Sequence, residues 1–454
     1  MESSECSVLV DWPKRRLQFL AQLNPSRSEV RVLPPTAEVS FVPMESVGEY
    51  GGLSSLETRT LEAVYGGYTY FRDGDVVVAK ITPCFENGKG ALAVGLTGGV
   101  AFGTTELHVL RPGPEIDPKF LFYITISQHF RDVGAAAMTG AAGQKRVPEE
   151  FLRNYRVSLP PKSVQRIIAD FLDEKTAAID ALIAKKERLI ELIEEKRQAT
   201  ITHAVTKGLD PDVPMKDSGV EWLGEVPETW RLSRLKHLVD KPAGIQMGPF
   251  GTSLTDLAVE DTGFKLYGQE NTISGDFTVG DRWIIAEQFE RLSRYELRAG
   301  DIVLTRKGSI GNCRIAPAGI KSGIIDSDTI RVRVGPQVES RFLQRVLHYA
   351  TYVRNQVFAN RRGAILSGLN SSNIAELWIA VPPLAEQSAI VNAIDRQAAA
   401  MDNVVAQVEQ QTTRLREYRQ TLISAAVTGQ LDVRSRTARA LDPTAPEPLE
   451  EVLT

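Results

Sequence analysis

The side chains best suited to chemistry in this sequence are basic and amide residues that stand in small groups, several of them beside glycine. Arg and Lys contact phosphates and the edge of guanine, whereas Asn and Gln suit the edge of adenine. Glycine lets the backbone approach a duplex closely. Most basic pairs are only solvated surface, but some of these recur at corresponding places in the two halves of the chain. The pattern predicts DNA contacts from the following residues: Gln144, Lys145, Arg146, Gln269, Asn271, Arg306, Lys307, Arg361 and Arg362. Lys80, Lys89 and Ser309 complete the set of candidate DNA contacts.

The sequence motifs of catalysis are missing. There is no GxxxxGK[ST] phosphate loop, and no GxGxxG segment follows a predicted strand. The 5 histidines form no HExxH or HxxxH pair that could hold a metal, and the 3 cysteines have no CxxC spacing. We therefore expect no catalytic residue, no metal and no cofactor in this chain.

The clearest feature of the sequence is an internal repeat. Residues 159–210 align with residues 381–432 at a constant offset of 222. Each copy begins with a Pro-Pro pair and continues without Pro or Gly until Gly208 or Gly429. Proline is tolerated at the start of a helix and disrupts its interior, so each copy predicts one long helix. About 45 residues at 1.5 Å each would make it roughly 65 Å long.

Apolar residues recur every seven positions in both predicted helices, with a few polar exceptions such as Lys186 and Gln411. A sustained heptad repeat is typical of helices that supercoil, and polar residues in the interface can specify register. The shared phase predicts that the two helices pack on each other, and the domain between them allows an antiparallel arrangement. The expected interface residues include Leu172, Ile179, Leu182, Ile193, Ile394, Met401, Val404, Val408, Leu415, Tyr418 and Leu422.

The regions outside the long helices read as mixed α/β domains. Short apolar runs at residues 75–80, 301–306 and 329–334 predict strands, and residues 118–133 and 340–358 predict short helices. Gly74-Asp75 and Gly300-Asp301 precede strands that end on a basic residue, which suggests a common framework. The predicted organisation is a first domain at 1–158, a long helix at 159–207, a linker and second domain at 208–380, a second long helix at 381–433, and a disordered tail at 434–454.

The fold class predicted from these elements is α+β. It consists of two mixed α/β domains joined by two long helices packed as an antiparallel coiled coil, a pseudo-twofold tandem duplication. Length and composition agree, since 454 residues predict two to four domains and 43% hydrophobic residues suit globular proteins. The net charge of −4 means that any nucleic-acid surface must be local. The sequence lacks a signal peptide and a membrane-spanning stretch, so we expect a cytoplasmic protein.

Three motifs and the repeat together resemble the DNA specificity (S) subunit of Type I restriction-modification systems. The motifs are GVEWLGEVPETW at residues 219–230, GPFGTSL at 248–254 and GDIVLTR at 300–306, and the resemblance covers nearly the whole chain. The first half departs from the family in its lead-in, which is reduced to Asp11-Trp-Pro-Lys14.

The resemblance implies a non-catalytic subunit with two target recognition domains, each reading half of a bipartite DNA site. Two methyltransferase (M) subunits would dock on it and methylate adenine at N6 with S-adenosylmethionine. Two restriction (R) subunits can add cleavage driven by ATP and Mg. The partners implied are therefore double-stranded DNA and these subunits, without a membrane. The resemblance also places Arg306, Lys307 and Ser309 in a DNA-contacting loop of the second domain, with Lys80, Lys145 and Arg146 in the first.

Two alternatives remain open on the sequence. A coiled-coil scaffold that never touches DNA would explain the long helices and the negative charge. A self-sufficient DNA methyltransferase or nuclease would explain DNA contacts, although the missing motifs argue against it.

Overall fold

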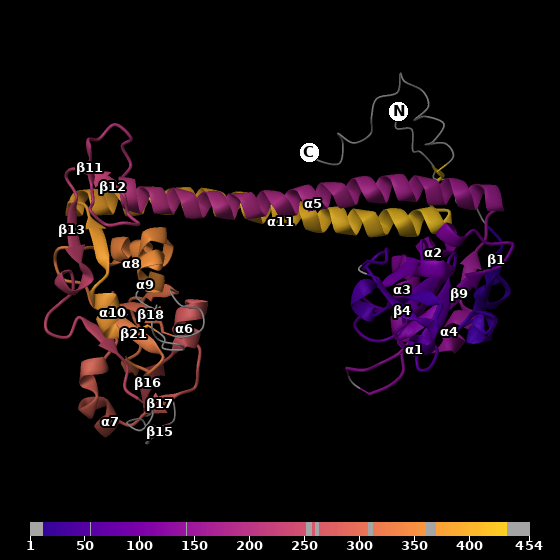
Figure 1. The fold of residues 1–454 in the computed structure, drawn as a ribbon, viewed down its shortest axis with the longest axis horizontal. Helices are drawn as coiled ribbons and strands as arrows, with labels where there is room; N and C mark the ends of the chain where they lie inside the picture. Colours follow the sequence, from indigo (N-terminus) through magenta and orange to yellow (C-terminus); the bar gives the residue numbers. More distant parts are fainter. Residues whose placement is uncertain are drawn as a thin grey trace, which may run out of the picture. The chain divides into compact units, whose positions relative to one another are not determined.

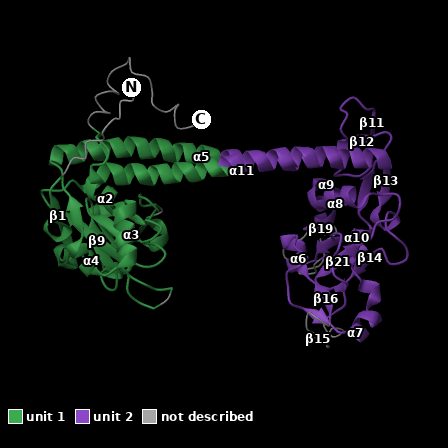
Figure 2. Cartoon of the chain, turned by 180° about the vertical axis from the view of Figure 1, so that it is seen from behind, with its two compact units in different colours: residues 1–187, 409–454 green, residues 188–408 purple. Residues whose placement is uncertain are grey.

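The structure is a computed structural model that describes residues 12–54, 56–141, 143–250, 257–258, 263–306, 312–359 and 369–433. The chain divides into two compact units: unit 1 comprises residues 1–187 and 409–454, and unit 2 comprises residues 188–408 (Figure 2). The division falls within both long helices, so each unit contains one mixed domain and a portion of each long helix.

Unit 1 contains two four-stranded sheets with the orders β2-β9-β6-β7 and β4-β3-β8-β5. The strand β6 is apolar throughout because its two faces pack on different layers. Val76 and Val78 face the short helices, whereas Val77 and Ala79 face the second sheet. The elements are β1 (Lys14–Arg16), β2 (Ala21–Leu23), β3 (Glu38–Val42), β4 (Glu57–Thr60), α1 (Leu61–Val64), β5 (Thr69–Arg72), β6 (Val76–Ala79), β7 (Gly90–Leu92), β8 (Val100–Gly103), β9 (Leu107–Pro112), α2 (Pro118–Ile126), α3 (Gln128–Ala136), α4 (Glu149–Asn154) and β10 (Arg156–Ser158).

Unit 2 repeats this plan with sheets of the orders β14-β21-β18-β19 and β15-β17-β16-β20. Ile302 and Leu304 pack with the helices, and Val303 packs towards the second sheet. The elements are β11 (Met215–Asp217), β12 (Glu225–Pro227), β13 (Arg231–Arg234), β14 (Ile245–Met247), β15 (Leu257–Ala258), β16 (Phe264–Tyr267), α6 (Gln269–Ser274), β17 (Trp283–Ile284), α7 (Ala286–Arg291), β18 (Ile302–Thr305), β19 (Cys313–Ile315), β20 (Gly323–Ile325), β21 (Thr329–Val332), α8 (Ser340–Tyr349), α9 (Thr351–Ala359), α10 (Ser371–Ala375) and β22 (Trp378–Val381).

The two domains share pairings as well as strand order. Each contains one parallel pair, β3 with β8 and β16 with β20, among antiparallel neighbours. The strands expected at 75–80, 301–306 and 329–334 are β6, β18 and β21, which confirms those predictions. The common framework suggested by the two Gly-Asp pairs is therefore present in three dimensions.

An Arg–Asp ion pair is repeated at atomic detail in the two frameworks. Arg111 Nε and Nη2 both lie 2.8 Å from the carboxylate oxygens of Asp75. Arg333 makes the same bidentate contact with Asp301, at 2.8 and 2.7 Å. Both aspartates also accept a backbone N–H from three residues earlier. The Gly-Asp pairs noted in the sequence, Gly74-Asp75 and Gly300-Asp301, therefore form the turns that lead into β6 and β18.

The long helices are α5 (Lys162–Lys207) and α11 (Leu384–Thr428), which lie side by side (Figure 1). Their interface, here called the seam, is antiparallel within each unit. In unit 1, Lys186 Nζ donates to Gln411 Oε1 at 2.6 Å and Asp180 pairs with Arg419 at 2.9 Å. In unit 2, Arg197 pairs with Asp402. At the repeat offset of 222, Arg197 corresponds to Arg419 and Asp402 corresponds to Asp180, so the same ion pair occurs in both units.

The heptad prediction is confirmed for some seam residues and wrong for others. Buried apolar residues at the expected positions are Leu172, Ile179, Ile394, Val408 and Leu422. In contrast, Leu182, Val404 and Tyr418 are exposed by 41%, 44% and 44%. Two helices that pack on each other cover only a narrow stripe of each, and these three side chains lie outside that stripe.

Matching polar contacts hold each long helix to its own domain. Gln165 Oε1 accepts from Asp117 N, and its Nε2 donates to the carbonyls of Glu115 and Pro160. Gln387, at the offset of 222, makes the corresponding bonds, with Glu339 N as donor. Both glutamine side chains are fully buried. The resulting register positions each domain on the start of the helix that follows it.

Two expected elements differ in detail. The helix predicted at 118–133 is divided into α2 and α3 at Ser127, whose hydroxyl caps α3. The helix predicted at 340–358 is likewise divided into α8 and α9 at Ala350. Strand β1 begins at Lys14, the last residue of the short lead-in, and pairs antiparallel with β10 as β13 pairs with β22. The domain limits given above stay predictions, and the tail at 434–454 lies outside the described residues.

Candidate nucleic-acid interface

Lys80 and Arg306 occupy matching positions at the ends of β6 and β18. Lys80 N donates to Glu106 O at 2.9 Å, and its carbonyl accepts from Val147 N. Arg306 N donates to Asp328 O at 3.0 Å, and its carbonyl accepts from Leu369 N. Each basic residue therefore joins the same three chain segments of its domain, and this correspondence is what the sequence comparison of the two halves suggested.

In unit 1 the loop after α3 carries three of the predicted contacts. Arg146 pairs with Ile81 and Thr139 in β-bridges, and Thr82 N donates to Lys145 O at 3.0 Å. Gly140 adopts a φ of 128°, which permits the sharp turn. Gln144, Lys145 and Arg146 are all exposed. The structure therefore gathers Lys80 and these three residues on adjoining loops.

The charge of this loop is partly balanced. Arg146 makes a bidentate contact with Glu106, with both bonds at 2.8 Å. This hydrogen bonding lowers the pKa of the Glu106 carboxyl, although partial burial opposes the shift. Among the described residues no ion pair engages Lys145. Lys145 is therefore the cation of this loop that is most available to a phosphate.

A buried histidine supports the same loop from beneath. His108 Nε2 lies 2.9 Å from Val147 O, which requires the ring nitrogen to carry the proton. Burial lowers the pKa of His108, so the imidazole is neutral near pH 7. We assign His108 a structural role.

Lys89 is half-buried, and its Nζ donates to Met44 O at 3.2 Å. It belongs to the segment of residues 83–90 that follows Lys80. This hydrogen bond ties the segment to the chain around Met44, so Lys89 contributes to loop geometry even before any ligand is bound.

In unit 2 the side chain of Arg306 joins three chain segments. Its Nε donates to Leu369 O at 2.9 Å, and its Nη1 donates to Ser327 O at 3.2 Å. The guanidinium lies over the ring of Phe250, 5.8 Å from the centroid, and Phe250 is 58% exposed. A Cβ at Gly248 would lie 2.0 Å from Asp326 O, so only glycine fits where this segment passes.

Gln269 and Asn271 begin helix α6, near the turn at Asp326. Gln269 is half-buried at the first position of the helix. Asn271 is 1% exposed, and its amide bonds to Gly268 N, Asp276 O and Val279 O at 3.0, 3.1 and 2.9 Å. The amide is thus fully engaged within the chain, and the expectation that Asn271 faces a base is not carried forward.

Lys307, Ser309, Arg361 and Arg362 lie outside the described residues. The described residues that flank these segments, Arg306 and Leu369, are hydrogen bonded to each other. The role predicted for these four side chains stays a prediction.

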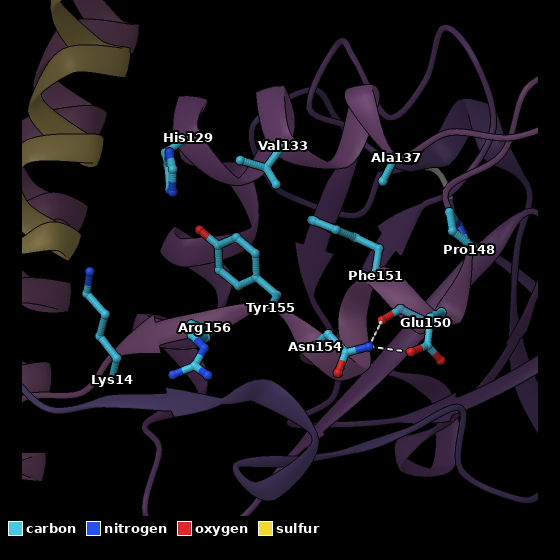
Figure 3. Close-up of a pocket in the computed structure, with 10 residues that line it drawn as sticks. All are labelled: Lys14, His129, Val133, Ala137, Pro148, Glu150, Phe151, Asn154, Tyr155 and Arg156. Atoms are coloured by element: carbon cyan, nitrogen blue, oxygen red, sulfur yellow. Dashed lines mark hydrogen bonds between the residues drawn. The ribbon is translucent and has the colours of Figure 1, made fainter.

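A hollow of about 550 Å³ lies elsewhere in unit 1 (Figure 3). Phe151 and Tyr155 stand together at its centre, with ring centroids 5.5 Å apart. Val133 and Ala137 add apolar walls, and Lys14, His129 and Arg156 lie around them. Burial raises the pKa of Tyr155. None of the predicted DNA contacts lines this hollow.

Within the described ranges, no group of three or more His, Cys, Asp or Glu side chains is arranged to hold a metal. No helix in that part of the chain is both long and apolar enough to cross a membrane.

Sequence reasoning missed the acidic and aromatic partners of the basic residues. The pairing of Arg146 with Glu106 joins residues 40 positions apart, and no local pattern signals it. Phe250 could have been noticed, since it is the aromatic residue of the GPFGTSL motif.

The sequence is similar to known DNA specificity proteins. The family model of the Type I restriction modification DNA specificity domain matches residues 38–192. The specificity subunits of the Type I restriction enzymes EcoEI and EcoAI of Escherichia coli are each 42% identical over 163 residues, which cover 35% of this chain and 27% of theirs. The StySPI specificity subunit of Salmonella potsdam is 26% identical over 340 residues, covering 72% of this chain and 68% of that one.

Solved structures share the fold. A chain from the structure of a type I R-M system matches with a TM-score of 0.71 and 19% identity over 93% of this chain and 98% of that one. The HsdS subunit from Thermoanaerobacter tengcongensis matches with a TM-score of 0.56 and 20% identity over 93% and 97%. Residues 38–192 thus match the Type I restriction modification DNA specificity domain, and the resemblance of the chain to Type I specificity subunits is confirmed.

Proposed function

We propose that this chain is the non-catalytic subunit that reads a bipartite DNA target for a Type I restriction-modification system. The observation that carries the proposal is the repeated framework with a basic residue, Lys80 or Arg306, at the same position of each domain. Two domains that share a strand framework but differ in their loop residues could each recognise a different half-site. The matched DNA specificity domain supports DNA as the ligand.

The proposal assigns catalysis to partners. Two M subunits would methylate adenine at N6 with S-adenosylmethionine, and two R subunits would use ATP and Mg for cleavage, all in the cytoplasm. Exposed apolar side chains on the long helices support docking of such partners, because soluble proteins rarely expose large apolar patches that are not interaction sites. On α5 the exposed apolar residues include Leu182, Leu189 and Leu192. The same residues would serve the alternative of a scaffold without DNA, which predicts no duplex binding.

Replacing Lys80 and Lys145 with Ala should weaken DNA binding and reduce its salt dependence. Each lost phosphate contact lowers the slope of log K against log salt by about 0.9, so the double variant should lose roughly 2. The measurement is duplex binding by the full chain with its M subunits at several salt concentrations. Lys175→Ala, at an exposed lysine of α5 paired with Glu174, is the matched control. An unchanged slope in the double variant would contradict the assignment.

A further inference from the structure

Tyr50 lies between two buried arginines in unit 1. The Arg131 guanidinium lies 4.9 Å from the ring centroid of Tyr50, and that of Arg419 lies 5.2 Å from it. Both arginines are at most 7% exposed. A cation over an aromatic ring is more strongly attracted when it is desolvated, so this arrangement holds the ring firmly.

The two arginines come from different parts of unit 1. Arg131 belongs to α3, and its Nη2 donates to Gln128 Oε1 and to Gln420 Oε1 of α11 at 2.7 and 2.8 Å. Arg419 belongs to α11 and pairs across the seam with Asp180 of α5. We call Tyr50, Arg131, Arg419, Asp180 and Gln420 the Tyr50 cluster. It connects the seam to α3, the helix that leads into the loop of Lys145.

The cluster also holds the segment after Lys80. Tyr50 N donates to Gly88 O at 3.0 Å, and Arg131 Nη1 donates to Glu86 O at 3.0 Å. Glu49 forms a β-bridge with Lys89. Tyr50 has a φ of 63°, a conformation that non-glycine residues adopt rarely and that surrounding contacts must maintain. A Cβ at Gly88 would lie 2.9 Å from the Tyr50 ring, so the segment packs directly on it.

We infer that Tyr50 is a positioning residue for DNA recognition, which fixes the basic loops of the first domain to the seam of the long helices. The inference rests on the proposed function. The repeat offers an internal comparison, because Arg197 and Gln198 in unit 2 stand at the offset of 222 from Arg419 and Gln420. There Arg197 pairs with Asp402 and Gln198 Nε2 donates to Tyr349 O at 2.6 Å. The seam pair is thus common to both units, and among the described residues a guanidinium of the seam lies over an aromatic ring in unit 1.

The first test is hydrogen exchange of the free full-length chain. Tyr50→Leu keeps an apolar side chain but removes the ring, and exchange at residues 86–90 should rise about tenfold while unit 2 is unchanged. Tyr50→Phe keeps the ring and loses only the hydroxyl contact with Arg131 at 3.3 Å, so it should exchange like the wild type. Unchanged exchange in Tyr50→Leu would overturn the positioning role.

The second test is discrimination between cognate and altered half-sites by the full chain with its M subunits. The half-site at which Lys145→Ala weakens discrimination is taken as the one that the first domain reads. Tyr50→Leu and Arg419→Met should each lower discrimination at that half-site about tenfold and leave the other unchanged. Arg197→Met removes the matching seam arginine in unit 2 and is the control, which should leave the first half-site unaffected.

Equal losses at both half-sites would indicate a general loss of stability and overturn the inference. Failure of the wild-type complex to bind any duplex would instead overturn the proposed function. The exchange experiment still decides, in that case, whether Tyr50 orders the loop in the free protein.

Discussion

Replacing Asp301 with Asn should lower the free energy of unfolding of unit 2 by about 3 kcal/mol, because it leaves the half-buried Arg333 without its buried carboxylate partner. Asp301 is 2% exposed and makes two charged hydrogen bonds to Arg333. Arg331 lies fully buried nearby, and burial together with the charge of Arg333 lowers the pKa of Arg331 to about 10. Without Asp301 the repulsion between Arg331 and Arg333 would be opposed by the weaker interactions with Glu296 and Asp240.

Tryptophan fluorescence during urea unfolding measures this effect. Four of the 5 tryptophans, Trp222, Trp230, Trp283 and Trp378, lie in unit 2, so the signal reports mainly on that unit. Asp75→Asn is the matched variant in unit 1, and its cost should be smaller because Arg111 keeps a second carboxylate, Glu29, at 2.6 Å. An Asp301→Asn protein with the wild-type unfolding midpoint would show that the ion pair does not hold the framework.

Lengthening both long helices by one heptad should change the spacing of the DNA target without changing the half-sites. Seven residues inserted after Glu187 and seven before Glu409 keep the seam in phase, since Lys186 and Gln411 are partners there. Seven helical residues add about 10 Å, which corresponds to roughly 3 base pairs. Binding to the original target should fall by about a hundredfold, because both half-sites can no longer be engaged at once.

A panel of duplexes with spacers longer by one to five base pairs tests this prediction. The expected result is tightest binding at a longer spacer with the same half-site bases. Continued preference for the original spacer would show that the helices do not set the distance between half-sites.

The features that could be predicted from sequence are those with a local or periodic signal. The long helices followed from an uninterrupted run between a Pro-Pro pair and a glycine, and β6 and β18 followed from apolar runs after Gly-Asp. The exposure of Leu182 and Tyr418 could not be predicted, because a heptad pattern names the apolar positions without saying how wide a stripe the partner covers.

For the candidate site, the sequence indicated basic and amide residues, and their contact with DNA stays a prediction. Lys80 and Arg306 were found because both end a repeated strand, and the structure gives them matching backbone partners. Asn271 has the right chemistry for a base contact, but its burial depends on a turn that propensity does not reveal. The Tyr50 cluster joins residues 369 positions apart, so no sequence window contains it.

The most direct test of the account is a map of N6-methyladenine in the genome of the source cells with this gene present and deleted. We expect that one bipartite motif is methylated in the presence of the gene and loses its methylation on deletion, while other methylated motifs persist. Restoring the gene with Lys80 and Lys145 replaced by Ala should restore the motif only weakly. A methylation pattern that is identical with and without the gene would contradict the proposal that this chain selects the DNA target.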